Sequence, residues 1–138
     1  MLDGKNFRAE TRQCRWPGKP RCRRRAGVVK KGLILGADGF IGRHIAFHLR
    51  AGGWEVPTSA RRTTRLHHMG FQTFTADLAR PETPDPAFWQ EAAHGRLIVN
   101  AAGLLNGSDA AFNAVHVLAP QAAYEHADGG VLISAVGI

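Results

Sequence analysis

The fold is decided by ten residues that read Leu33-Ile34-Leu35-Gly36-Ala37-Asp38-Gly39-Phe40-Ile41-Gly42. Three apolar residues are followed by glycines at every third position and by an amphipathic stretch, which predicts a buried strand, a tight turn and a helix. Gly36 permits the tight turn, Gly39 lets backbone N–H groups approach a pyrophosphate, and Gly42 lets the helix press on the strand. This pattern favours a dinucleotide-binding turn, and a simple strand-to-helix turn is the alternative interpretation.

The acidic residue in this turn needs a separate explanation. An ionised carboxylate at Asp38 would weaken the binding of a pyrophosphate unless it points away from it. Aspartate is also a favoured residue at the start of a helix, where its carboxylate accepts hydrogen bonds from backbone N–H groups. We therefore expect Asp38 to cap the helix that follows.

The rest of the chain alternates between short apolar runs and amphipathic stretches, which indicates successive βα units. Strands are expected at residues 33–35, 54–59, 71–76, 97–99 and 131–133, with Pro57 weakening the second. Helices are expected at 40–49, at 65–69, around Phe88 and Trp89, and from a cap at Ser108 or Asp109 through Phe112, Val115, Ala119 and Ala122, with a kink at Pro120.

Continuously apolar strands are buried on both faces, which favours a parallel sheet with helices on each side. Right-handed crossovers then give the strand order 3-2-1-4-5. The predicted fold class is therefore α/β, a doubly wound, Rossmann-like parallel sheet. In this order a crevice opens between strands 1 and 4 at their carboxyl ends, where a ligand is expected.

The positive charge of the chain is confined to its amino-terminal part. The whole chain carries +7, but residues 1–31 hold 11 Lys and Arg against 2 Asp and Glu. We divide the chain into a basic arm, residues 1–28, and a nucleotide-binding domain, residues 29–138. The arm is expected to be disordered and solvated. A phosphate-binding arm for nucleic acid or acidic lipid, and an expression or start-site extension, are the alternatives.

Composition also bounds the compartment and the metal chemistry. Cys14 and Cys22 lie in the arm without further ligands nearby, so neither a disulfide framework nor a metal site is expected. No apolar run is long enough to span a bilayer, and the amino terminus lacks the apolar stretch of a secretory signal. A cytoplasmic protein without membrane insertion is predicted.

The end of the second strand indicates which dinucleotide is preferred. An acid there would accept hydrogen bonds from an adenosine ribose, whereas an arginine would pair with a 2′-phosphate. Between Glu55 and Asp77 the sequence has no acid, and Arg61, Arg62 and Arg65 occupy the expected loop. NADP(H) is therefore favoured over NAD(H), with a solvated basic loop as the alternative.

Four motifs follow one another along the chain: the glycine turn, Ala76-Asp77-Leu78, Val99-Asn100-Ala101-Ala102-Gly103 and Ile133-Ser134-Ala135. In this order and spacing they resemble the short-chain dehydrogenase/reductase superfamily, in its extended and atypical, epimerase/dehydratase-like branches. The resemblance covers residues 29–138 and implies a nicotinamide dinucleotide as cofactor.

The resemblance also implies roles for individual residues. The pyrophosphate would lie against Gly36, Gly39, Phe40, Ile41 and Gly42. The 2′-phosphate would contact Arg61, with Arg62 as a further cofactor-binding candidate. Asp77 and Leu78 would lie against the adenine, and Ala101, Ala102 and Gly103 would line the cofactor. Ser134 falls where the family has the catalytic serine that binds the substrate carbonyl. A turn residue at Asp77, a loop-anchoring amide at Asn100 and an ordinary strand end at Ser134 are the alternatives.

The superfamily's Tyr-x-x-x-Lys pair is absent from this sequence. The single tyrosine is Tyr124, and position 128 is Asp128. The chain therefore resembles a cofactor-binding portion truncated after the fifth strand, which we expect to bind NADP(H) without catalysing hydride transfer alone. An active reductase or epimerase completed by another chain, and a scaffold or nucleic-acid-binding protein acting through the arm, are the alternatives. The exposed side of the fifth strand is expected to meet a second copy or a partner subunit.

Overall fold

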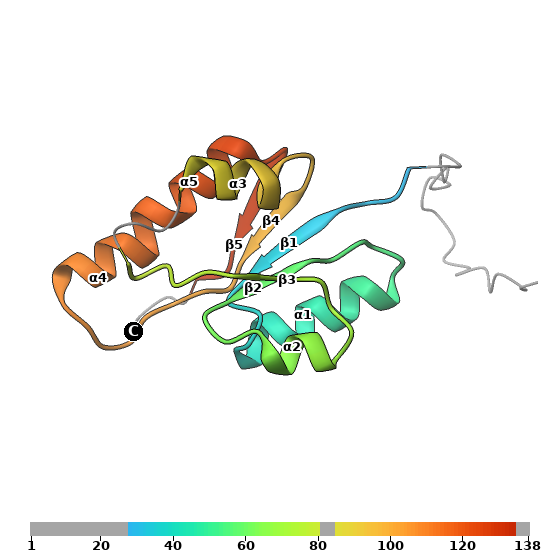
Figure 1. Cartoon of the computed structure of the whole chain (residues 1–138), viewed down its shortest axis with the longest axis horizontal. Coiled ribbons are helices and arrows are strands. Elements are labelled where there is room, and N and C mark those ends of the chain that lie inside the picture. The colour runs from blue at the N-terminus through green and yellow to red at the C-terminus, as the bar shows by residue number, and fades with distance from the viewer. Residues whose placement is uncertain (1–27, 81–84, 135–138) are drawn as a thin grey trace, which may run out of the picture.

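A five-stranded parallel sheet forms the centre of the molecule (Figure 1), as a computed structural model describing residues 28–80 and 85–134 shows. The strand order is β3-β2-β1-β4-β5, and every neighbouring pair is parallel. The predicted fold class and strand order are confirmed. The strands are β1 Gly32–Leu35, β2 Thr58–Ala60, β3 Thr73–Thr75, β4 Leu97–Asn100 and β5 Gly129–Leu132.

Helices cover both faces of this sheet (Figure 1). One layer holds α1 and α2, and the other holds α3, α4 and α5. The helical segments are α1 Phe40–Ala51, α2 Thr64–His68, α3 Pro86–Ala93, α4 Asp109–Asn113, a π-helical turn at Ala114–Leu118, and α5 Ala119–His126.

The central strand supplies both halves of the core. Leu33 and Leu35 pack with Trp89 of α3 in one cluster, whereas Ile34 packs with Leu66 of α2 in the other. All three β1 residues are fully buried. Because successive strand residues point to opposite faces, a strand covered on both sides must be apolar at every position. Each such side chain contributes about 1.5 to 3 kcal/mol through its burial.

The second strand is shorter than the sequence predicts, because of Pro57. The ladder between β2 and β3 begins at Thr58, whose N–H donates to the Gln72 carbonyl at 2.9 Å. Pro57 has no N–H to donate, although its own carbonyl accepts from the Ile34 N–H at 3.2 Å. Upstream of the proline, a single parallel β-bridge between Lys31 and Glu55 joins this segment to the backbone just before β1.

The long helix after β4 accommodates Pro120 through a π-helical turn. Ser108 is the N-cap of α4, and its hydroxyl accepts a hydrogen bond from the Ala111 N–H at 3.2 Å, as one of the two predicted caps. Further along, the Ala119 N–H bonds to the Ala114 carbonyl, five residues back. Pro120 lies at the start of α5 and lacks the N–H that a regular α-helix would use there. The predicted disturbance at Pro120 is therefore observed as a widened turn.

The fifth strand leaves apolar side chains in contact with solvent. β5 pairs with β4 on one side, and the exposed fractions of Val131 and Leu132 are 46% and 61%. The predicted exposure at this edge is observed. That a second copy or a partner subunit covers the edge stays a prediction.

Most of the predicted arm falls outside the residues that the structure describes, including Cys14 and Cys22. Val28, the last residue assigned to the arm, is 77% exposed, and regular structure begins at Gly32. None of the helices in residues 28–80 and 85–134 is long and apolar enough to cross a membrane. In the same two ranges no three His, Cys, Asp or Glu side chains gather as potential metal ligands.

Two adjacent glycines of β5 give a matched test of the packing between α5 and the sheet. A Cβ at Gly130 would overlap the Tyr124 ring, whereas a Cβ at Gly129 would meet Leu97 Cδ1 at an ordinary 3.5 Å. We expect Gly130→Ala to lower the free energy of unfolding by about 1 to 3 kcal/mol and Gly129→Ala to change it by less than about 0.5 kcal/mol. Urea denaturation measures both. Equal effects in the two variants would contradict this packing.

Candidate functional site

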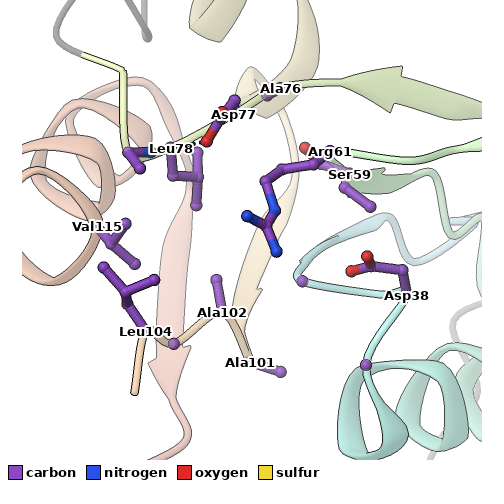
Figure 2. A pocket seen from close by; sticks show the side chains of 15 residues that line it. Asp38, Ser59, Arg61, Ala76, Asp77, Leu78, Ala101, Ala102, Leu104 and Val115 are labelled. Carbon is purple, nitrogen blue, oxygen red and sulfur yellow. Dashed lines mark hydrogen bonds between the residues drawn. The ribbon is translucent and has the colours of Figure 1, made fainter. Parts of the chain in front are cut away.

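A pocket of about 270 Å³ opens at the carboxyl ends of the first four strands (Figure 2). This is the edge at which the strand order predicts a ligand. The loops that follow β1, β2, β3 and β4 each contribute to its wall. The lining residues are Gly36, Asp38, Gly39, Ser59, Ala60, Arg61, Ala76, Asp77, Leu78, Ala79, Ala101, Ala102, Gly103, Leu104 and Val115.

Two glycines of the turn are required by the protein's own packing. Gly36 has a φ of +72°, and a Cβ there would lie 2.7 Å from the Ala102 Cα atom. A Cβ at Gly42 would overlap the Gly36 carbonyl oxygen. The predicted roles in turn formation and helix–strand contact are confirmed for these two residues.

The third glycine faces the pocket. A Cβ at Gly39 would meet the Gly36 carbonyl oxygen at 3.3 Å, which is tight but leaves room for a small adjustment. Gly39 is also the N-cap of α1, and no side chain in the described part of the chain caps this helix. The first-turn N–H groups are therefore free to bind an anion, which the helix dipole also favours.

The prediction that Asp38 caps α1 is wrong. The helix starts one residue later than this prediction requires, so that Gly39 occupies the N-cap position and the Asp38 side chain makes no capping hydrogen bond. Asp38 is instead exposed and lines the pocket. Figure 2 shows its carboxylate pointing toward the space that the Arg61 guanidinium enters.

The loop after β4 is held in place by a buried amide. Asn100 is 2% exposed, and its Oδ1 atom accepts a hydrogen bond from the Ala102 N–H at 3.1 Å. The Ala101 N–H donates to the Leu35 carbonyl at 3.0 Å. Asn100 is thus a loop-anchoring residue, and it places Ala101, Ala102 and Gly103 along the pocket wall.

Asp77 organises the turn after β3. One carboxylate oxygen accepts a hydrogen bond from the Ala79 N–H at 3.1 Å, and the other lies 3.5 Å from Arg80 Nε. The alternative interpretation as a turn residue is therefore correct, although Asp77 and Leu78 also line the pocket. Their contact with an adenine stays a prediction.

Arg61 is the basic residue of the pocket wall. Its guanidinium extends into the cavity (Figure 2), and none of the ion pairs within the described residues involves it. Arg62 is exposed and lies outside the lining.

The remaining predicted residues also lie outside the lining. Phe40 and Ile41, on the first turn of α1, are 73% and 52% exposed. Ser134 is exposed beyond the end of β5. The binding roles of these three residues stay predictions.

Leu104 and Val115 line the pocket although the sequence did not mark them as site residues. Val115 lies in the π-helical turn and is 6% exposed. Its neighbour His116 brings Nε2 within 3.4 Å of the Leu104 N–H. The apolar periodicity of the helix predicted a buried Val115 but not which loop it would meet.

Tyr124 lies beneath β5 and outside the pocket lining. Its hydroxyl is buried without a hydrogen-bond partner in the described part of the chain. Burial raises the pKa of Tyr124 above its usual 10.0, and the interaction with the neighbouring Asn100 side chain partly opposes this rise in pKa.

Comparison with models of protein families shows to which family the chain belongs. The model of the NAD dependent epimerase/dehydratase family matches residues 32–121, which is more than half of the chain. The chain belongs to this family. A search of curated proteins finds no match. The matched range contains the glycine turn and all the residues that line the pocket of this family member.

Solved structures show the same fold. A short-chain dehydrogenase/reductase superfamily protein from Agrobacterium tumefaciens, with bound NAD, is 19% identical over 74% of this chain and 31% of its own, with a TM-score of 0.57. A short-chain dehydrogenase from Streptomyces avermitilis is 21% identical over 73% of this chain and 44% of its own, at 0.59. BdcA from E. coli, in complex with NADPH, is 19% identical over 71% of this chain and 46% of its own, with a TM-score of 0.56. The chain thus spans less than half the length of these three structures.

The single tyrosine permits a direct test of the environment under β5. Because burial raises the pKa of Tyr124 in the folded chain, the folded state holds this proton more tightly than the unfolded state. The contribution of protonated Tyr124 to the free energy of unfolding is present below pH 10.0. It is lost as the pH rises toward the pKa of Tyr124 in the folded chain. We expect tyrosinate absorbance to appear at higher pH in the folded chain than in urea, and Tyr124→Phe to remove that part of the alkaline loss. Equal titration midpoints in the folded chain and in urea would contradict the raised pKa of Tyr124.

Proposed function

We propose that this epimerase/dehydratase family member binds a nicotinamide dinucleotide, with NADP(H) preferred. The observation that carries the proposal is the glycine cradle at the carboxyl edge of the sheet. There an uncapped helix start faces a pocket that Gly39 keeps free of side-chain atoms. A pyrophosphate fits this cradle, since backbone N–H groups and the positive end of the α1 dipole both favour an anion.

The preference for the phosphorylated form rests on the end of β2. Ser59, Ala60 and Arg61 line the pocket there, so no carboxylate from this strand end is available to the 2′-hydroxyl of an adenosine ribose. The Arg61 guanidinium extends into the cavity and makes no ion pair with another described residue. It can therefore pair with a 2′-phosphate through charge-assisted hydrogen bonds.

The remaining lining suits the rest of an adenosine. Leu78 and Ala102 offer apolar surface on two sides of the pocket, and Asp77 holds the loop after β3 in place. The volume of about 270 Å³ is slightly smaller than that of typical ligand pockets, which hold roughly 300 to 1,000 Å³. This size suits one half of an extended dinucleotide.

We do not expect hydride transfer by these residues alone. The Tyr124 hydroxyl is buried and Tyr124 lies outside the pocket lining, and Asp128 stands where a lysine would be needed to lower the pKa of a tyrosine. Ser134 remains the candidate for contacting a substrate carbonyl. Completion by another chain, as in an active reductase or epimerase, remains the alternative.

The exposed apolar residues of β5 form the surface where we expect a second copy or another subunit to bind. The cytoplasm remains the expected compartment.

Calorimetric titration with NADPH and NADH tests the proposal. We expect saturable binding of both, tighter for NADPH. Arg61→Ala should weaken NADPH binding by about tenfold to a hundredfold, because a charge-assisted hydrogen bond contributes roughly 1.5 to 3 kcal/mol, and should leave NADH binding nearly unchanged. Gly39→Asp should weaken both nucleotides, since it places a carboxylate in the cradle.

Arg62→Ala is the matched control, because Arg62 is the exposed neighbour that does not line the pocket. It should reduce NADPH affinity less than Arg61→Ala does. Absence of binding to either nucleotide, in a chain that circular dichroism shows to be folded, would refute the proposed function. Equal affinities for both, unaffected by Arg61→Ala, would refute the preference alone.

A further inference from the structure

Among the residues that the structure describes, the Asp38 side chain has no bonding partner that would give it a structural role. It precedes the N-cap of α1 and does not cap that helix. No hydrogen bond or ion pair within residues 28–80 and 85–134 engages its carboxylate. Its neighbour Ala37 is fully buried, whereas Asp38 is exposed and lines the pocket. The Asp38 carboxylate therefore faces whatever enters that pocket.

Three charged residues line this pocket, and two of them are uncommitted. Asp77 is held by the Ala79 N–H and by Arg80. Arg61 and Asp38 extend from different loops, one after β2 and one after β1, and Figure 2 shows the carboxylate directed toward the guanidinium. No ion pair within 4.0 Å joins the two groups, so each remains available to a ligand.

We infer that Asp38 is a specificity-determining residue that weakens the binding of a 2′-phosphorylated dinucleotide relative to the unphosphorylated one. The inference rests on the proposed function, in which Arg61 receives the 2′-phosphate. Asp38 shares the pocket with Arg61 and therefore repels the same phosphate that Arg61 attracts. The choice between the two cofactors depends on both side chains together.

The repulsion can be separated from any effect on the pyrophosphate. The pyrophosphate is common to NADPH and NADH, so its interaction with Asp38 cancels in the ratio of the two dissociation constants. The 2′-phosphate carries about 1.5 to 2 negative charges and occurs only in NADPH. Removing a carboxylate charge that shares the pocket with this group should change the affinity for NADPH by about tenfold, which is the order of the interaction between nearby charges at a protein surface.

The experiment compares Asp38→Asn with the unchanged chain in calorimetric titrations with NADPH and with NADH. We expect the ratio of the NADH to the NADPH dissociation constant to rise about tenfold in Asp38→Asn. The rise should shrink between about 0.02 M and about 0.5 M salt, since screening weakens interactions between exposed charges. Asp128→Asn is the matched control. Asp128 is exposed next to the amino-terminal end of β5, at the opposite edge of the sheet from the pocket.

Each outcome decides the inference. A ratio that is unchanged in Asp38→Asn, or that rises equally in Asp128→Asn, overturns it. A ratio that falls also overturns it, since Asp38 would then be orienting Arg61 favourably. Equal tightening of both nucleotides assigns Asp38 to the pyrophosphate and overturns it as well. If the unchanged chain binds neither nucleotide, the proposed function fails first, and the inference fails with it.

Discussion

The rest of the pocket depends on how closely α1 approaches the end of β1. No side-chain atom fits between Gly42 and the Gly36 carbonyl, or between Gly36 and Ala102. These two contacts fix the start of α1 on one side of the turn and the loop after β4 on the other. The buried Asn100 side chain anchors that loop, because its Oδ1 atom accepts a hydrogen bond from the Ala102 N–H. These backbone contacts thereby place the turn after β1 and the loop after β4 around the pocket, and apolar side chains pack against both faces of β1.

Much of this arrangement could be predicted from the sequence because it follows from local patterns. Apolar runs and the glycine turn predicted a parallel sheet in the correct order, and crossover handedness left few alternatives. Residues placed at strand ends also reached the pocket: Gly36, Gly39, Arg61, Asp77, Leu78, Ala101, Ala102 and Gly103. Element boundaries were less predictable. The β2–β3 ladder begins only after Pro57, at Thr58. Helix α1 begins after Gly39, so Asp38 lies outside the helix.

Contacts between distant segments could not be predicted in this way. Val115 lines the pocket because the helix after β4 folds back over the Leu104 loop, and no local pattern encodes that approach. The charge arrangement is of the same kind, since Asp38 and Arg61 are far apart in sequence and meet only where two βα loops share one edge. The sequence predicted the attraction of Arg61 for a phosphate. Asp38 was predicted to cap α1, whereas the structure places it in the lining of the same pocket as Arg61.

The π-helical turn at Ala114–Leu118 has a consequence for comparing this chain with its relatives. A π-helical turn contains one residue more than the α-helical turn that it replaces, so the helix is in effect α-helical with a one-residue insertion. Val115, Ala119 and Ala123 are buried at intervals of four, whereas the regular period had favoured Ala122 as the next inward position. With a relative whose helix is regularly α-helical in this region, an alignment without a gap pairs α5 out of register by one position. Equivalent residues on the two sides of Pro120 should therefore be assigned from their burial, with a one-residue gap placed inside the turn.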